Sequence, residues 1–155
     1  STGEIIGKDV NLPKALYKGF IASGVNVPDY GTALMTVSDK DKAEIIPLAK
    51  RLISLGYHIV ATTGTGKALE AEGIKVDVIE KINENSNDIL DAIRDGRINL
   101  VVNTMTEGKT SETDGFLIRR EAVENNIPCL TSLDTAEALL QAMETIHFQL
   151  EDMSK

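Results

Sequence analysis

The sequence predicts an α/β protein built on a parallel sheet that is covered on both faces. Short apolar runs alternate along the chain with longer segments in which apolar residues recur at helical spacing. The apolar runs are unbroken, which is typical of parallel strands buried on both faces. The length of 155 residues suits one such domain with a sizeable core. Crossovers between the strands are expected to be right-handed.

The expected elements follow in order from residue 11. An amphipathic helix over 11–22 lies in a lead-in of residues 1–30 that precedes the first strand. The apolar runs predict strands at 32–37, 57–61, 75–79, 98–103 and 128–130. The segments with helical spacing predict helices at 39–55, 66–72, 87–95, 115–125 and 135–150. Three of these helices are followed directly by glycine, at Gly56, Gly73 and Gly96, where glycine is favoured.

Composition limits the class of protein. The net charge of −8 argues against a non-specific nucleic-acid or anionic-membrane binder, although it leaves room for one small anion site. The single cysteine, Cys129, excludes a disulfide framework and favours a reducing, cytoplasmic setting. No apolar run approaches the ~18 residues of a membrane span, and no signal peptide opens the chain. The first residue is serine, so the chain is expected to be processed or cut from a longer protein.

Polar side chains gather where the predicted strands end, which is the ligand-binding edge of an open α/β sheet. The stretch Thr62-Thr63-Gly64-Thr65-Gly66 follows the second strand and leads into a helix, so its backbone N–H groups could hold a phosphate. It matches neither a phosphate loop of the GxxxxGK[ST] type nor a full dinucleotide fingerprint. The alternative is a simple turn with a helix cap supplied by Thr63 or Thr65.

Other groups at this edge extend the hypothesis of an anion site. Spacing does not rank Lys40, Lys42 and Lys67, although Lys42 and, after the third strand, Lys81 could both reach the loop. The polar segment 103–115 leaves the fourth strand toward the same crevice, and such loops often carry recognition groups. Asp114 either caps the following helix or touches a ligand hydroxyl.

The sequence offers few candidate catalytic residues. His58 falls inside a predicted strand and His147 in the last helix, so neither is placed for proton transfer. Cys129 is expected to be a small core residue, and no spacing of metal ligands occurs. The residues by themselves therefore predict a phosphate-type site with no catalytic residue and no metal.

Several segments resemble the methylglyoxal-synthase-like domain family. They are "GTALMTVSDKDK", "ATTGTGKALEAEGI", "VIEKI", "AIRDGRINLVVNT" and "GFLIRREAVENNIPCLTSLDTAEAL". The family includes methylglyoxal synthase, the IMP cyclohydrolase part of a bifunctional purine enzyme, and the regulatory domain of carbamoyl-phosphate synthase. The lead-in "STGEIIGKDVNLPKALYKGFIASG" is similar to the end of the second synthetase unit of that bacterial large chain. The resemblance implies two parts: 1–30, the end of the synthetase unit, and 31–155, the regulatory domain.

The resemblance also implies a three-layer fold, a five-stranded parallel sheet with helices on both faces. It implies a nucleotide effector whose phosphate meets Lys42, Thr62, Thr63, Gly64 and Thr65. The base and ribose would meet Lys81, Asn103, Asp114 and either Met105 or Thr106, of which Thr106 is favoured because methionine cannot donate a hydrogen bond. Thr131 would face the synthetase side, where some members bind ornithine.

The implied role is allosteric. UMP would inhibit, and IMP or phosphoribosyl pyrophosphate would activate, the synthesis of carbamoyl phosphate for pyrimidine and arginine formation. Partners would be the rest of the large chain and the glutaminase small chain. ATP, Mg or Mn, and K would serve the parent enzyme, and this chain would need no cofactor.

Departures from methylglyoxal synthase support the regulatory hypothesis over the enzymatic one. The aspartate that this enzyme uses aligns near Ser86, and its "PHDPD" loop aligns with "SETDG". Enolisation of a triose phosphate would then lack both proton carriers. A structural or oligomerisation domain with a vestigial site is the third hypothesis.

Overall fold

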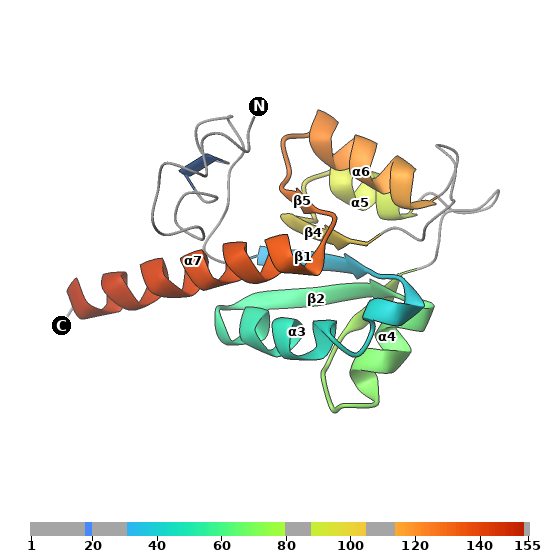
Figure 1. Ribbon diagram of the computed structural model, residues 1–155. Helices are drawn as coiled ribbons and strands as arrows, with labels where there is room; N and C mark the ends of the chain where they lie inside the picture. Colours follow the sequence, from blue (N-terminus) through green and yellow to red (C-terminus); the bar gives the residue numbers. More distant parts are fainter. Residues whose placement is uncertain (1–17, 20–30, 80–87, 105–113, 154–155) are drawn as a thin grey trace.

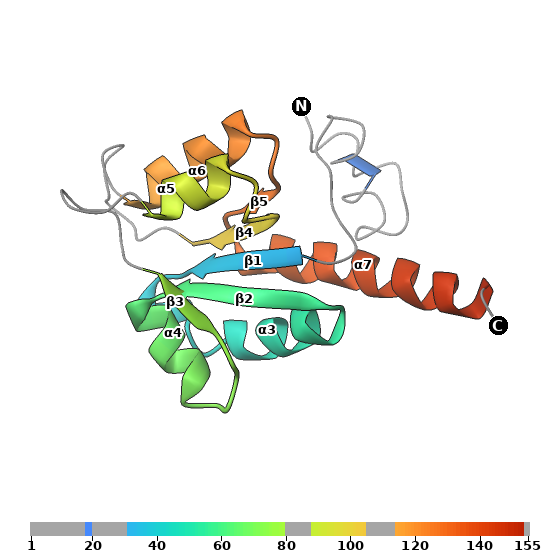
Figure 2. The ribbon, with the colours of Figure 1, turned by 180° about the vertical axis from the view of Figure 1, so that it is seen from behind.

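A computed structural model describes residues 18–19, 31–79, 88–104 and 114–153. Their centre is a five-stranded, all-parallel sheet with the strand order β3-β2-β1-β4-β5 (Figures 1 and 2). The strands are β1 (Gly31–Thr36), β2 (Tyr57–Thr62), β3 (Asp77–Ile79), β4 (Leu100–Asn103) and β5 (Cys129–Leu130). The predicted parallel sheet of five strands is confirmed. The predicted lead-in over 1–30 lies outside the described residues, apart from Lys18 and Gly19.

Helices cover both faces of the sheet and complete three layers. Two separate cores result, because alternate residues of β1 point to opposite faces. Ala33 and Met35 pack toward the side of α3 (Ile45–Ser54), α4 (Thr63–Glu70) and α7 (Leu133–Met153). Leu34 packs toward α5 (Asp88–Arg94) and α6 (Asp114–Glu124) on the other side. None of the described helices is both long and apolar enough to cross a membrane.

The helix expected at 39–55 is divided in two. A short 3₁₀ turn, η1 (Asp39–Asp41), is followed by α3, which begins only at Ile45. Pro47 explains the break. It is the third residue of α3, where a missing N–H has no intrahelical partner to lose. A helix beginning at residue 39 would place the same proline in its interior.

The glycine-containing stretch after β2 is a helix rather than a loop. Helix α4 begins at Thr63 instead of the predicted Gly66, and its N-cap residue, Thr62, makes no side-chain capping hydrogen bond. A Cβ added to Gly66 would lie 3.1 Å from a methyl group of Val78. Gly66 therefore lets α4 lie close to β3, which is a packing role. The caps proposed from the sequence, Thr63 or Thr65, are wrong by one to three residues.

The last helix begins earlier and ends later than expected. Ser132 precedes it, and its Oγ accepts a hydrogen bond from the backbone N–H of Thr135 at 3.2 Å. This is the usual N-capping arrangement for serine, in which one free N–H of the first turn is satisfied. The remaining elements predicted within the described residues agree with the structure to within two residues at each end, and the helix predicted over 11–22 lies outside them apart from Lys18 and Gly19.

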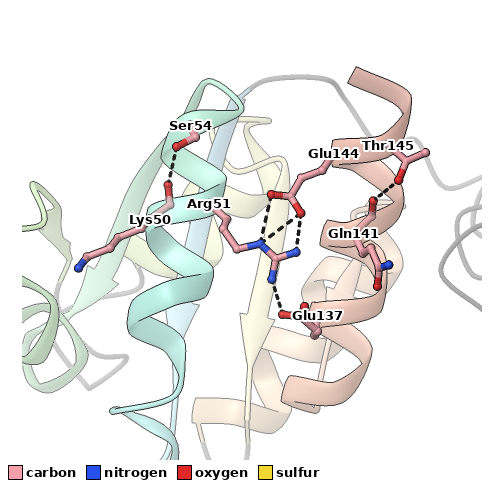
Figure 3. A network of polar contacts seen from close by, with 7 residues as sticks. All are labelled: Lys50, Arg51, Ser54, Glu137, Gln141, Glu144 and Thr145. Atoms are coloured by element: carbon pink, nitrogen blue, oxygen red, sulfur yellow. Dashed lines mark hydrogen bonds and ion pairs between the residues drawn. The ribbon is translucent and has the colours of Figure 1, made fainter. Parts of the chain in front are cut away.

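A polar cluster fastens α7 to α3 (Figure 3). The guanidinium group of Arg51 on α3 bonds Glu144 and Glu137, which lie two turns apart on α7, and both closest N···O distances are 2.5 Å. Both carboxylates raise the pKa of Arg51 above its already high usual value, and Glu144 has the larger effect. The side chain of Arg51 is 29% exposed, so this pair is better shielded than an ordinary surface pair.

The amino end of β1 is closed by a side chain. The Oδ1 atom of Asn99 accepts a hydrogen bond from the N–H of Thr32 at 2.9 Å. A Cβ at Gly31 would lie 2.4 Å from that oxygen, and Gly31 has a φ of +150°. Only glycine fits at position 31, because a side chain there would collide with the side-chain amide of Asn99. The hydrogen bond from Thr32 to that amide extends the pairing of β1 with β4.

Candidate functional site

The carboxyl ends of β1, β2 and β4 place most of the predicted site residues on one edge of the sheet. β1 is central, and the chain passes from it to β2 on one side and returns to β4 on the other. The switch point of this topology is therefore the boundary between β1 and β4. Open α/β sheets bind ligands in the crevice beyond the carboxyl ends at such a point.

The side chain of Lys42, which belongs to the turn between η1 and α3, reaches the amino end of α4. A Cβ built on Gly64 would be 3.0 Å from its Nζ, so the ammonium group is against the first turn of that helix. The first N–H groups of a helix have no intrahelical partner and carry the positive end of its dipole. The lysine charge and the helix end thus act in the same direction and attract an anion. Nζ also forms an ion pair with Oδ1 of Asp39.

The three threonines expected at the phosphate have different surroundings. Thr63 is exposed, whereas Thr62 is 6% exposed and Thr65 only 1%. The Oγ1 atom of Thr65 accepts a hydrogen bond from the N–H of Val37, at 3.3 Å. Thr65 thereby joins α4 to the segment that leaves β1. Its hydroxyl hydrogen remains available as a donor, because this bond uses only an oxygen lone pair.

Asn103, at the end of β4, is buried and bonded on both sides. Its Oδ1 accepts a hydrogen bond from Oγ1 of Thr36 at 2.7 Å, and its Nδ2 donates to the carbonyl of Gly115 at 2.8 Å. The side chain therefore connects β1 and β4 with the first turn of α6. The bond to Gly115 uses one of the two hydrogens of the Nδ2 amide group.

The remaining predicted contacts divide into two groups. Lys81 and Thr106, together with the alternative Met105, lie outside the described residues. Asp114 is the first residue of α6, one residue earlier than the helix predicted at 115–125. Thr131 is exposed and follows the outer strand β5, so β4 separates it from the end of β1. The structure thus brings together Lys42, Thr62–Thr65 and Asn103, and sets Thr131 apart.

Sequence reasoning did not assign roles to the groups that hold the segment after β1. The N–H of Ser38 donates to Oγ1 of Thr104 at 2.9 Å, and Oγ of Ser38 donates to Asp41 at 2.8 Å. Thr104 is 8% exposed. Its position directly after the last residue of a central strand was the signal that could have identified it, because such residues face the crevice.

Both histidines of the sequence lie away from this edge. His58 is at the amino end of β2, where its Nε2 lies 2.5 Å from Oδ2 of Asp77. Thr62 lies four residues further along the strand, or about 13 Å away. His147 is on α7. Burial raises the pKa of the Cys129 thiol to about 11, so the thiolate is disfavoured. Within the described ranges, no three His, Cys, Asp or Glu residues are grouped so that they could hold a metal ion.

Comparison with known proteins identifies the family. Residues 44–131 match the family described as the MGS-like domain, and they make up more than half of the chain. The chain belongs to the MGS-like domain family. The matched segment runs from the residue before α3 to Thr131 and includes all of α4 and β4.

Solved structures of low sequence identity share the fold of this MGS-like domain. Methylglyoxal synthase from Elizabethkingia anophelis NUHP1 superposes with a TM-score of 0.61 and 19% identity, over 74% of this chain and 79% of that one. A protein named ForH superposes with a TM-score of 0.56 and 23% identity, over 76% and 81%. Identities at this level carry the arrangement of the sheet and helices and no more.

Proposed function

We propose that this MGS-like domain is the allosteric regulatory domain of a carbamoyl-phosphate synthase large chain, and that it binds a nucleotide effector by its phosphate. The observation that supports this most directly is the position of the Lys42 ammonium group against the first turn of α4. UMP is the proposed inhibitor, and IMP or phosphoribosyl pyrophosphate the activator. The resemblance of the lead-in to a synthetase unit supports the choice of parent enzyme.

The chemistry of the site favours binding over catalysis. The sequence contains two histidines, and both are remote from the carboxyl ends of the strands. A reaction at a triose phosphate needs groups that accept and donate protons within hydrogen-bond reach of the substrate. Phosphate binding needs only donors and positive charge, and charge-assisted hydrogen bonds contribute roughly 1.5–3 kcal/mol each.

Allosteric control requires that the effector bind one state of the whole enzyme better than another. Asn103 provides a connection of the right kind, because it bonds β1 through Thr36 and α6 through Gly115. A nucleotide that used the second hydrogen of its amide group would favour one placement of α6. Couplings of this kind are typically about 1–3 kcal/mol.

Calorimetric titration of the chain with UMP, IMP and phosphoribosyl pyrophosphate tests the proposal. We expect one of them to bind, and Lys42→Ala to weaken that binding at least tenfold, since a charge-assisted bond is lost. Lys50→Ala is the matched control because Lys50 is an exposed lysine of α3. Absence of binding by all three nucleotides would contradict the proposal and favour a structural role.

A second candidate function is methylglyoxal synthase, and the similarity of fold to that enzyme is the observation in its favour. An assay of phosphate release from dihydroxyacetone phosphate separates the two. We expect no release above the uncatalysed rate. Robust turnover that is lost in Lys42→Ala would establish the enzyme and overturn the regulatory proposal.

A further inference from the structure

The Lys42 ammonium group is paired with an anion that belongs to the chain itself. Asp39, at the start of η1, forms an ion pair with the same Nζ that lies against Gly64 of α4. We infer that the carboxylate of Asp39 is an internal competitor, which the phosphate group of a ligand must displace from Lys42. This inference rests on the proposed function and adds a residue that lowers the affinity of the site.

The exposure of the two side chains makes such displacement easy. Asp39 is 95% exposed, so water reaches its carboxylate directly and can solvate the charge in place of Lys42. The side chain of Lys42 is 26% exposed, and its stem is therefore held while the partner leaves. Ion pairs between side chains that reach water are weak, because water solvates each charge almost as well as the partner does.

The other two charged side chains of η1 are placed differently from Asp39. The carboxylate of Asp41 accepts a hydrogen bond from Oγ of Ser38 at 2.8 Å. Lys40 is exposed and carries the opposite charge. The backbone N–H of Ser38 donates to Thr104, which fixes the start of the turn. The turn can thus keep its position while the Asp39 side chain moves.

The size of the effect follows from simple competition. The apparent dissociation constant of a ligand is multiplied by one plus the equilibrium constant of the internal pair. For an ion pair of the strength usual at exposed positions, this factor is roughly two to six. Removing the carboxylate should therefore tighten phosphate binding by that factor.

Titration of UMP into four variants tests the inference. Asp39→Asn removes the competing charge and keeps the shape of the side chain. Asp95→Asn is the control for net charge. Asp95 is exposed and follows α5, at the opposite edge of the sheet, so this variant removes an equal charge far from the site. Lys42→Ala and the double variant Asp39→Asn, Lys42→Ala show whether the effect acts through the lysine.

We expect Asp39→Asn to bind UMP about two- to sixfold more tightly than the wild type. Asp95→Asn should change the affinity less, and Asp39→Asn should have no effect when Lys42 is absent. An affinity equal to that of Asp95→Asn, or an equal gain in the Lys42→Ala background, would overturn the inference while leaving the proposed function intact. If the wild-type chain binds none of UMP, IMP and phosphoribosyl pyrophosphate, both the inference and the proposed function are overturned.

Discussion

Single hydroxyl and amide groups determine the shape of the candidate site. Thr65, Thr104 and Asn103 each use a side-chain oxygen to accept a hydrogen bond from the segment Thr36–Ser38 that ends β1. All three are buried, so an unpaired partner would be costly. These residues fix the turn that carries Lys42, in addition to any contact with a ligand.

Thr104→Val should lower the free energy of unfolding by about 1–3 kcal/mol. Valine has nearly the same shape, but it leaves the N–H of Ser38 without the acceptor that now lies 2.9 Å away. Urea denaturation of the wild type and the variant measures the change. Thr145→Val is the control, because the hydroxyl of Thr145 donates to the carbonyl of Gln141 on an exposed helix surface. Equal stability of the two variants would contradict the role assigned to Thr104.

Cys129 should react slowly with alkylating reagents. Burial raises the pKa of its thiol from 9.0 to about 11, and the nearby Arg119 opposes this only in part. The thiolate fraction at pH 8 is then roughly 100-fold smaller than for an unperturbed thiol, and the thiolate is the reacting species. The rate of iodoacetamide labelling against pH checks this. A rate equal to that of free cysteine would contradict it.

The same pKa makes the stability depend on pH. A thiol whose pKa is higher in the folded state contributes stability below pH 9, and this contribution is lost as the pH rises through about 11. Comparing urea denaturation at pH 8 and pH 10.5 should show a smaller loss for Cys129→Ala than for the wild type. Equal losses would show that Cys129 does not contribute.

Between the helices and the sheet, specific side chains set both the contacts and the element boundaries. Gly66 permits the close approach of α4 to β3, Pro47 fixes where α3 begins, and Arg51 joins α3 to α7. The sequence identified each helix by its apolar spacing. It did not reveal that α4 begins at Thr63, because glycines and threonines are poor helix formers and tertiary packing decided the outcome.

Arg51→Met should destabilise the chain by about 1 kcal/mol, since it removes bonds to two carboxylates and leaves Glu137 and Glu144 as a like-charged pair. Methionine keeps most of the apolar stem, so the loss reports on the charged group. Arg97→Met, at an exposed pair with a separation of 3.4 Å, should change stability by less than about 0.5 kcal/mol. Thermal denaturation distinguishes the two, and equal effects would count against the α3–α7 connection.

At the scale of the whole molecule, alternation of apolar runs with helical segments was sufficient to predict the five-stranded parallel sheet. The site was only partly predictable. The sequence placed Lys42, the Thr62–Thr65 stretch and Asn103 at one edge, because strand ends share an edge in a parallel sheet. It could not show that Asp39 pairs with Lys42, or that Thr104 supports Ser38, since these contacts depend on the path of the backbone after β1.

Ligand binding should stabilise the entire fold. At 100 times its dissociation constant, UMP is expected to add about 2.7 kcal/mol to the free energy of unfolding. For a chain of this size that corresponds to an increase in Tm of roughly 5–10 °C. Scanning calorimetry with UMP, with uridine as the ligand that lacks phosphate, measures the shift. A similar shift for uridine, or for UMP with Lys42→Ala, would contradict anchoring by phosphate.

The position of β1 also imposes an order on folding during synthesis. Among the strands of the sheet, β1 is the first in the chain, yet it lies in the centre of the sheet. Its residue Thr32 bonds Asn99, which is synthesised 67 residues later. Its edge toward β2 can pair early, while its other edge stays open until β4 leaves the ribosome. At about 5–20 residues per second this interval lasts several seconds. An open edge of Ala33, Leu34 and Met35 attracts other strands, so chaperone capture should be strongest for nascent chains that end shortly before β4.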